Sequence, residues 1–185
     1  MMIKILLSDR RFGPLPRLLF LVTTLLLSFG PAHSAPSPSI VAVERAAPFE
    51  LKDQYNQTNV YRFPRSKPTI FVFGDRRGSE QIEGWVRPVW DRYQERVDQK
   101  GVAVLSAVPA FMRGIIRSMF RSKVKYPVLL DWTGDVARSY SYQSGKAILV
   151  LIDQQGEVVL RLDGPVSRDG LQLLYARIDR LVTAS

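Results

Sequence analysis

Two short, almost wholly apolar segments constrain the fold more than any other feature of the chain. Thr69–Phe73 has the sequence Thr-Ile-Phe-Val-Phe, and Ala147–Asp153 has the sequence Ala-Ile-Leu-Val-Leu-Ile-Asp. A strand in which polar and apolar residues do not alternate is covered on both of its faces. The chain is therefore expected to form a sheet with other elements packed above and below it.

Strand and helix patterns alternate along the rest of the chain. Strands are expected at 49–53, 59–63, 69–73, 101–108, 127–131, 147–153 and 157–162, and helices at 79–99, 111–121, 134–140 and after Gly164-Pro165. This order predicts an α/β fold, a three-layer α/β/α sandwich with a mainly parallel central sheet, an antiparallel C-terminal hairpin and a terminal helix. Ser79 is expected to cap the first helix, because serine is a preferred N-cap residue.

The N-terminus has the order of parts that is typical of a secretory signal peptide. A basic start precedes the apolar run Leu18–Phe29, and small residues follow at 32–35. This run of about twelve residues is shorter than the ~20 that a membrane-spanning helix needs. We expect a signal peptide at 1–35, a flexible leader at 36–46 and one domain at 47–185, in an exported protein that is periplasmic or secreted. An uncleaved N-terminal anchor is the alternative.

The chain has no cysteine, and its single histidine, His33, lies in the expected signal peptide. The absence of cysteine excludes disulfides, thiolate nucleophiles, iron–sulfur clusters and cysteine-bound zinc. Without histidine, a mature chain also lacks Ser-His-Asp triads and the usual zinc and copper ligands, so no cofactor or metal is expected. Cleavage would also remove four basic residues and one acidic residue, which lowers the formal charge from +9 to +6.

Several short motifs, taken in order, resemble those of the redoxins. Phe49–Asp53 resembles the opening F-x-L-x-D, 126–140 the stretch PvllD-x-x-g-x-v-a-x-x-y, Leu151–Gly156 the motif flID-x-x-G, and Gly164–Ser167 the G-x-x-s before the last helix. Over residues 47–183 the chain is similar to the AhpC/TSA peroxiredoxins and the TlpA-like periplasmic thioredoxins. The resemblance implies a thioredoxin-like fold.

The chain departs from this family at its active-site positions. The family's cysteines would fall in the turn after the central strand, which here consists of Gly78, Ser79, Glu80, Gln81, Ile82 and Glu83. Ser144–Ala147 replaces the proline or arginine that the family has before its penultimate strand. Thiol exchange needs a thiolate, so neither oxidoreductase nor peroxidase activity is expected. The resemblance then implies an exported, redox-inactive member that acts as a binding or accessory protein in the cell envelope.

Other chemistry remains open at two places. An enzyme with non-thiol chemistry near Asp75, Ser79 and Glu80 is the alternative function, and a buried pocket with a raised carboxylate pKa would favour it. Ser122 and Lys125 have the S-x-x-K spacing of serine–lysine acyl transferases, but the partner motifs are absent and a solvated helix end is favoured.

Strand-end acids and a basic turn are the remaining candidate ligands. Asp131, Asp135 and Asp153 fit no calcium-loop spacing and are expected to cap turns. The turn Gly74–Gly78 carries Arg76 and Arg77 before a helix N-terminus, where anions bind readily. It is a candidate anion site.

A basic stripe is the last candidate. No acid occurs between Gln99 and Leu130, and Arg113, Arg117 and Arg121 share one helical face near Lys123 and Lys125. Like charges at this spacing repel, so a partner protein or an anionic ligand, such as a lipid surface or polyanion, is expected to compensate them. The opposite face, with Phe111, Met112, Ile115 and Met119, is either core or a docking surface. Nucleic acid is not expected as a partner, and membrane contact is expected only through an uncleaved N-terminal segment.

Overall fold

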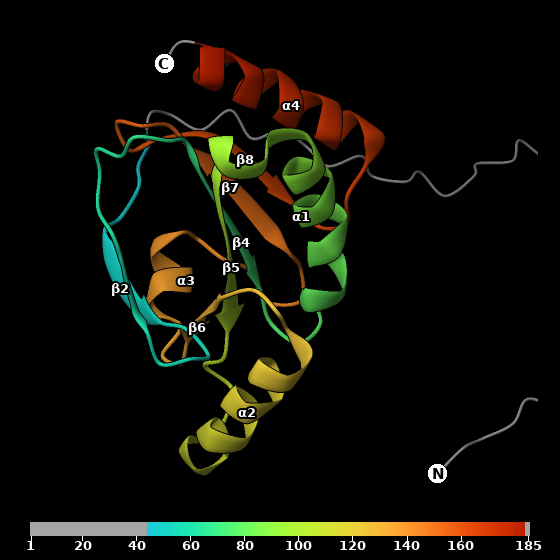
Figure 1. Cartoon of the computed structure of the whole chain (residues 1–185). Coiled ribbons are helices and arrows are strands. Elements are labelled where there is room, and N and C mark those ends of the chain that lie inside the picture. The colour runs from blue at the N-terminus through green and yellow to red at the C-terminus, as the bar shows by residue number, and fades with distance from the viewer. Residues whose placement is uncertain (1–43, 184–185) are drawn as a thin grey trace, which may run out of the picture. The chain divides into compact units, whose positions relative to one another are not determined.

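A six-stranded sheet forms the centre of the domain. The computed structural model describes residues 44–183, so the expected signal peptide and its cleavage site lie outside the described residues. The sheet contains β1 (Glu44–Arg45), β4 (Thr69–Gly74), β5 (Asp98–Val104), β6 (Val128–Asp131), β7 (Ile148–Ile152) and β8 (Glu157–Asp163), in the order β1-β8-β7-β4-β5-β6 (Figure 1). The two apolar segments that predicted a covered sheet, β4 and β7, are its central strands.

The sheet is mixed, which refines the expectation of a mainly parallel one. Parallel pairing joins β4 to β5 and β5 to β6. The pairings of β7 with β4, β8 with β7 and β1 with β8 are antiparallel. The expected C-terminal hairpin is therefore present, and it places β7 directly against the central strand β4. Because Glu44 and Arg45 pair with β8, ordered structure begins before residue 47, inside the expected leader.

Layers cover both faces of the sheet. Side chains of successive strand residues point to opposite faces, and β4 shows this clearly. Ile70 and Val72 pack with Trp85 of α1 (Ser79–Tyr93) and with α4 (Arg168–Thr183). Phe71 and Phe73 pack on the other face beneath a hairpin of β2 (Phe49–Lys52) and β3 (Thr58–Tyr61) and the short helix α3 (Asp135–Ser139). The second outer layer is thus a hairpin plus one short helix.

Helix α1 is shorter than the sequence pattern predicts. It ends at Tyr93 and is followed by a 3-10 turn over Gln94–Arg96, after which Asp98 begins β5. Gln94 has a φ of 47°, a left-handed conformation that stops a right-handed helix. The apolar spacing that predicted a helix to residue 99 continues into the strand, and spacing alone cannot locate this break.

Helix α2 (Arg113–Lys123) lies near β5 and β6 and follows a 3-10 turn over Ala110–Met112 (Figure 1). None of its residues is fully buried. Phe120 and Val124 attach it to a small apolar cluster formed by Ala103, Val128 and Leu130. The helix therefore keeps most of its surface outside the core.

The edge of the sheet at β6 is held by the β2–β3 hairpin. The buried side chain of Gln54 donates from Nε2 to the Tyr126 carbonyl at 2.8 Å and accepts from the Val128 amide at 2.8 Å. The neighbouring Asp53 forms an isolated antiparallel bridge with Leu129. A primary amide has the donor and acceptor of a peptide group, so Gln54 pairs with this edge as a strand would.

Candidate functional site

Asp75 organises the turn between β4 and α1, where the family's active site would lie. Its carbonyl accepts a hydrogen bond from the Ser79 amide at 2.8 Å, and its Oδ1 accepts from the amides of Arg77 at 3.0 Å and Gly78 at 2.9 Å. These bonds form the turn that leads into α1, whose N-cap is Gly78 without a side-chain capping bond. The prediction that Ser79 caps α1 is wrong, since Ser79 is the first residue of the helix and its hydroxyl donates to the Arg76 carbonyl.

The loop before β7 binds the same carboxylate from the other side. Asp75 Oδ2 accepts from the Ser144 hydroxyl at 2.5 Å and from the Gly145 amide at 2.8 Å. The Asp75 amide in turn donates to the Tyr142 hydroxyl at 2.8 Å. The two stretches at which the chain departs from the redoxins, Gly78–Glu83 and Ser144–Ala147, are thus brought together.

Two further contacts close the junction between the turn and the loop. The Ala147 amide donates to Gln81 Oε1 at 2.9 Å. Gly78 is buried against the loop so tightly that a Cβ on it would lie 2.4 Å from the Lys146 carbonyl oxygen. Only glycine allows such a close approach of two backbones. The turn between β4 and α1 is therefore packed tightly against the loop before β7.

Electrostatics hold Asp75 in its ionised form. Partial burial acts to raise its pKa, but the hydrogen bonds from Gly78, Ser144, Gly145 and Arg77 outweigh that effect and lower the pKa to about 2. Burial and the neighbouring Asp75 charge raise the pKa of Tyr142 to about 12. A general acid or base works best with a pKa near the operating pH. Neither group is poised to exchange protons near neutral pH.

The candidate anion site in this turn already contains the chain's own anion. The Asp75 carboxylate takes the amides of Arg77 and Gly78, which an external anion would need. The side chains of Arg76 and Arg77 lie exposed beside it, and so do those of Glu80 and Glu83. Glu83 forms an i,i+4 ion pair with Arg87 at 3.6 Å. The two amides of this turn are thus bound by Asp75.

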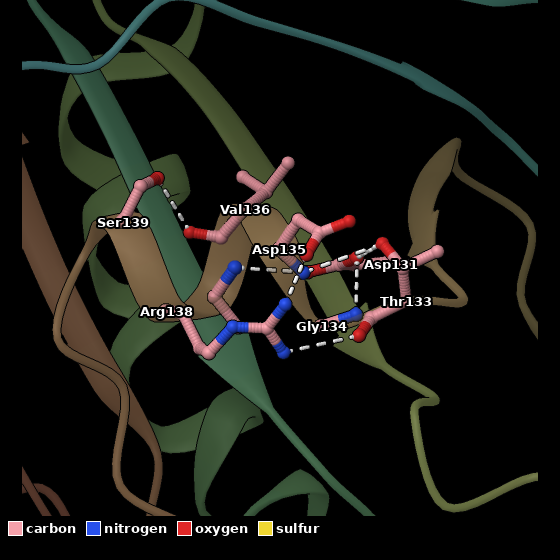
Figure 2. A network of polar contacts seen from close by, with 8 residues as sticks. Asp131, Thr133, Gly134, Asp135, Val136, Arg138 and Ser139 are labelled. Carbon is pink, nitrogen blue, oxygen red and sulfur yellow. Dashed lines mark hydrogen bonds and ion pairs between the residues drawn. The ribbon is translucent and has the colours of Figure 1, made fainter.

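The strand-end aspartates also have local partners. Buried Asp131 accepts from the amides of Gly134 and Ala137, both at 2.8 Å, and so caps α3, while Asp135 pairs with Arg138 (Figure 2). Asp153 accepts from the amides of Gln155 and Glu157 in the β7–β8 turn. Within residues 44–183, no cluster of three acidic or histidine side chains could hold a metal ion.

Helix α2 has the opposite orientation to the one that its charge pattern suggests. The guanidinium groups of Arg113 and Arg117 lie over the Trp132 ring, 5.5 and 5.9 Å from its centroid, on the side facing the domain. Phe111, Ile115 and Met119 point outward and are 83%, 65% and 40% exposed. Of the expected apolar face, Phe111, Ile115 and Met119 are therefore not core, whereas Met112 is half-buried. The two arginines make cation–π contacts with Trp132 on the inward side, where Phe120 also packs.

We use the name outer face of α2 for Ile115 and Met119 of the helix together with Phe111 of the preceding 3-10 turn, and the name basic flank for Arg121, Lys123 and the following Lys125. All of the flank side chains are exposed, and none forms an ion pair with an acid of the described region 44–183. Ser122 donates its hydroxyl to the Met119 carbonyl, which is the solvated helix end favoured from the sequence.

Sequence reasoning named Gln81 and the stretch that begins at Ser144, but not the contacts that they make, and it missed Tyr142 and Trp132. Gln81, Tyr142 and Ser144 complete the closed turn, and Trp132 contacts two arginines of α2. No sequence signal marks Tyr142 and Trp132, because their partners are distant in sequence.

Among residues 44–183, no helix combines the length and apolar character needed to cross a membrane. No protein-family model matches the chain, and no curated protein matches it.

Solved structures do resemble it. A Chlorobium tepidum protein provisionally named thiol:disulfide interchange protein DsbE has a TM-score of 0.60 at 17% identity, over 78% of this chain and 99% of its own. The exposed lipoprotein thioredoxin of Streptococcus pneumoniae has a TM-score of 0.56 at 16% identity, over 71% of this chain and 99% of its own. Peroxidoxin BcpB of Mycobacterium tuberculosis has a TM-score of 0.56 at 20% identity, over 75% of this chain and 96% of its own. The chain therefore has the thioredoxin-like fold of the redoxins, in a form without cysteine.

Proposed function

We propose that this protein is an exported, redox-inactive thioredoxin-like domain that acts as a binding or accessory protein in the bacterial cell envelope. The observation that carries the proposal is the closed turn around Asp75. The carboxylate is bound by the amides of Arg77, Gly78 and Gly145 and by the Ser144 hydroxyl. The polar groups of the surface that would meet a substrate are thus already bound to other groups of the same protein.

The alternative of non-thiol chemistry near Asp75, Ser79 and Glu80 has less support. A raised carboxylate pKa would favour it, and the Asp75 pKa is instead lowered to about 2. The Ser79 hydroxyl donates to a backbone carbonyl, and no histidine or lysine contact prepares it as a nucleophile among the described residues. Binding is therefore the better account of this surface.

The binding surface in this proposal is α2. Large apolar side chains rarely gather on a free surface without a partner, and here three of them line one exposed helical face beside uncompensated cations. The helix is also already folded and attached to the domain through Phe120 and Val124. Binding would not have to order it first, which lowers the cost of association.

Site-specific photo-crosslinking in exported protein tests the binding role. A photoreactive phenylalanine analogue at Phe111 or Ile115 is expected to form adducts with envelope material, because both positions of the outer face are exposed. The matched control is the same analogue at Val60 on β3, which is 45% exposed but lies outside α2. Adducts at Val60 as abundant as those at Phe111, or no adducts at all, would contradict the proposal.

The expected location needs its own measurement. N-terminal sequencing of exported material should find a chain that begins near residue 35 or 36. A chain that begins at Met1 would instead indicate an uncleaved anchor.

A further inference from the structure

The structure assigns a specific partner class to the α2 surface: we infer that α2 docks side-on onto an anionic lipid surface. The inference rests on the proposed binding role and names its partner. It departs from the expectation that only the N-terminal segment contacts a membrane. The sequence left open whether the apolar face with Phe111, Met112, Ile115 and Met119 is core, and in the structure Phe111, Ile115 and Met119 are exposed.

Geometry is the first argument. Ile115 and Met119 lie one turn apart on the same side of α2, and Phe111 lies four residues before Ile115, in the 3-10 turn Ala110–Met112 that leads into the helix. Phe111, Ile115 and Met119 can therefore enter an interface together, with the helix lying flat. Amphipathic helices bind bilayers in this way, with the apolar face buried ~5–10 Å into the boundary between headgroups and acyl chains.

The positive charge of the segment around α2 also favours an anionic surface. The segment from Gln99 to Leu130 contains no Asp or Glu. Lys100 at its start is paired with Asp98, whereas Arg121, Lys123 and Lys125 form no ion pair with any acid of the described region. Such cations are attracted to anionic headgroups when they lie near the membrane surface. The apolar line and the cations thus belong to one short stretch of chain.

Other occupants fit this surface less well. A second copy of the chain would bring the basic flanks of two α2 helices together, and like charges in an interface oppose association. A stable protein partner typically covers ~800 Å² on each side, whereas the apolar part of this surface is a single line of three side chains. A bilayer requires no matching pockets, so a narrow apolar line flanked by cations is sufficient.

Vesicle sedimentation with the full chain tests the inference. The probes are vesicles of equal parts phosphatidylglycerol and phosphatidylcholine, compared with vesicles of phosphatidylcholine alone. The combined variant Phe111→Ser, Ile115→Ser, Met119→Ser and the combined variant Arg121→Glu, Lys123→Glu, Lys125→Glu should each lower partition onto the anionic vesicles at least about tenfold. The N-terminal segment is the same in every protein, so the difference reports on α2.

Matched controls separate this surface from general apolar or charge effects. Tyr55→Ser with Val60→Ser removes apolar side chains that are 44% and 45% exposed on the β2–β3 hairpin. Arg168→Glu, Arg177→Glu and Arg180→Glu make the same charge change on the exposed surface of α4. Both controls should partition within about twofold of the wild type, since their positions lie outside the docking helix.

A single label adds a readout that folding defects cannot imitate. Because the chain has no cysteine, Ile115→Cys provides one unique site for a spin label. Its label should become inaccessible to a water-soluble relaxation agent on anionic vesicles, while a label at Val60→Cys should remain accessible.

Equal partition of wild type and both α2 variants, equal partition onto the two vesicle types, or an accessible Ile115→Cys label would each overturn the inference. If α2 instead crosslinks only to a protein and the vesicles do not bind, the lipid assignment fails and the proposed binding role stands. If neither vesicles nor crosslinks are found, both fail.

Discussion

The Ala147 amide donates a hydrogen bond to Gln81 Oε1 over 2.9 Å, and this bond joins the loop before β7 to the first turn of α1. The partners are 66 residues apart in the sequence. Without it, the backbone of Ala147 would present a free donor at the place where the redoxins have their proline or arginine. The side chain of Gln81 thus helps to hold the turn after β4 against the loop before β7.

Substituting Gln81 tests this closure. Gln81→Met keeps the length of the side chain but removes the acceptor, and leaving a part-buried amide unpaired should cost about 1–3 kcal/mol of unfolding free energy. Hydrogen exchange at the Ala147 amide should accelerate in the same variant. Gln81→Glu retains an acceptor oxygen and should lose less. Unchanged exchange in Gln81→Met would show that the bond does not protect the loop.

Substituting Asp75 tests the electrostatics of the turn. The folded pKa is about 2, below the ~3.9 of an unfolded aspartate. A lowered folded pKa means that the carboxylate stabilises the fold fully at pH values above the unfolded pKa, and that this contribution is lost as the pH falls through the folded pKa. Asp75→Asn should therefore cost about 1–2 kcal/mol at pH 7.

The pH profile distinguishes that effect from a simple loss of packing. In chemical unfolding measured from pH 7 to 2, the difference between wild type and Asp75→Asn should shrink below pH 4. Asp91→Asn, at an exposed position of α1, serves as the control and should track the wild type. A difference that stays constant down to pH 2 would argue against the ionised carboxylate.

Adding one methyl group at Gly78 tests how tightly the turn and the loop meet. The new Cβ in Gly78→Ala would lie 2.4 Å from the Lys146 carbonyl oxygen, so the backbone must move at a cost of about 1–3 kcal/mol. Gly114→Ala in α2 is the matched control, because no atom lies within 4 Å of its Cβ position. That change should stabilise the protein by about 0.5–1 kcal/mol, since alanine favours helix more than glycine does. Thermal or chemical unfolding compares the two.

Capping of α3 gives a fourth prediction. Asp131→Ala leaves the amides of Gly134 and Ala137 unpaired in a buried site, and should cost about 2–4 kcal/mol. Asp135→Ala, one turn away on the exposed side of α3, should stay within about 0.5 kcal/mol of the wild type. Similar losses in chemical unfolding of both variants would mean that Asp131 does not act as the cap.

The sequence predicted the layers of the fold well, because a strand that is buried on both faces is apolar at nearly every position. The segments at 69–73 and 147–153 became β4 and β7 for this reason. The turn Gly78–Glu83, which the resemblance placed after the central strand, follows β4. By contrast, the contact of Asp75 with Ser144 joins residues 69 positions apart, and no local pattern reports such a contact.

The orientation of α2 was beyond sequence reasoning for a related reason. The spacing of the charged residues shows which of them share a helical face. Which face points toward the domain depends on the side chains against which the helix packs. Arg113 and Arg117 lie over the Trp132 ring, while Phe111 and Ile115 are exposed. A helical projection alone would assign the opposite faces to core and solvent.

The bonds made by Gln54 have a consequence for how this protein assembles. A sheet grows by strand addition when the polar backbone groups of an edge strand are free. At β6 the Tyr126 carbonyl and the Val128 amide are already taken by Gln54, and Leu129 is bridged by Asp53. A peptide or a second sheet cannot lengthen the sheet there without displacing the hairpin, so the β6 side is protected against edge-to-edge polymerisation.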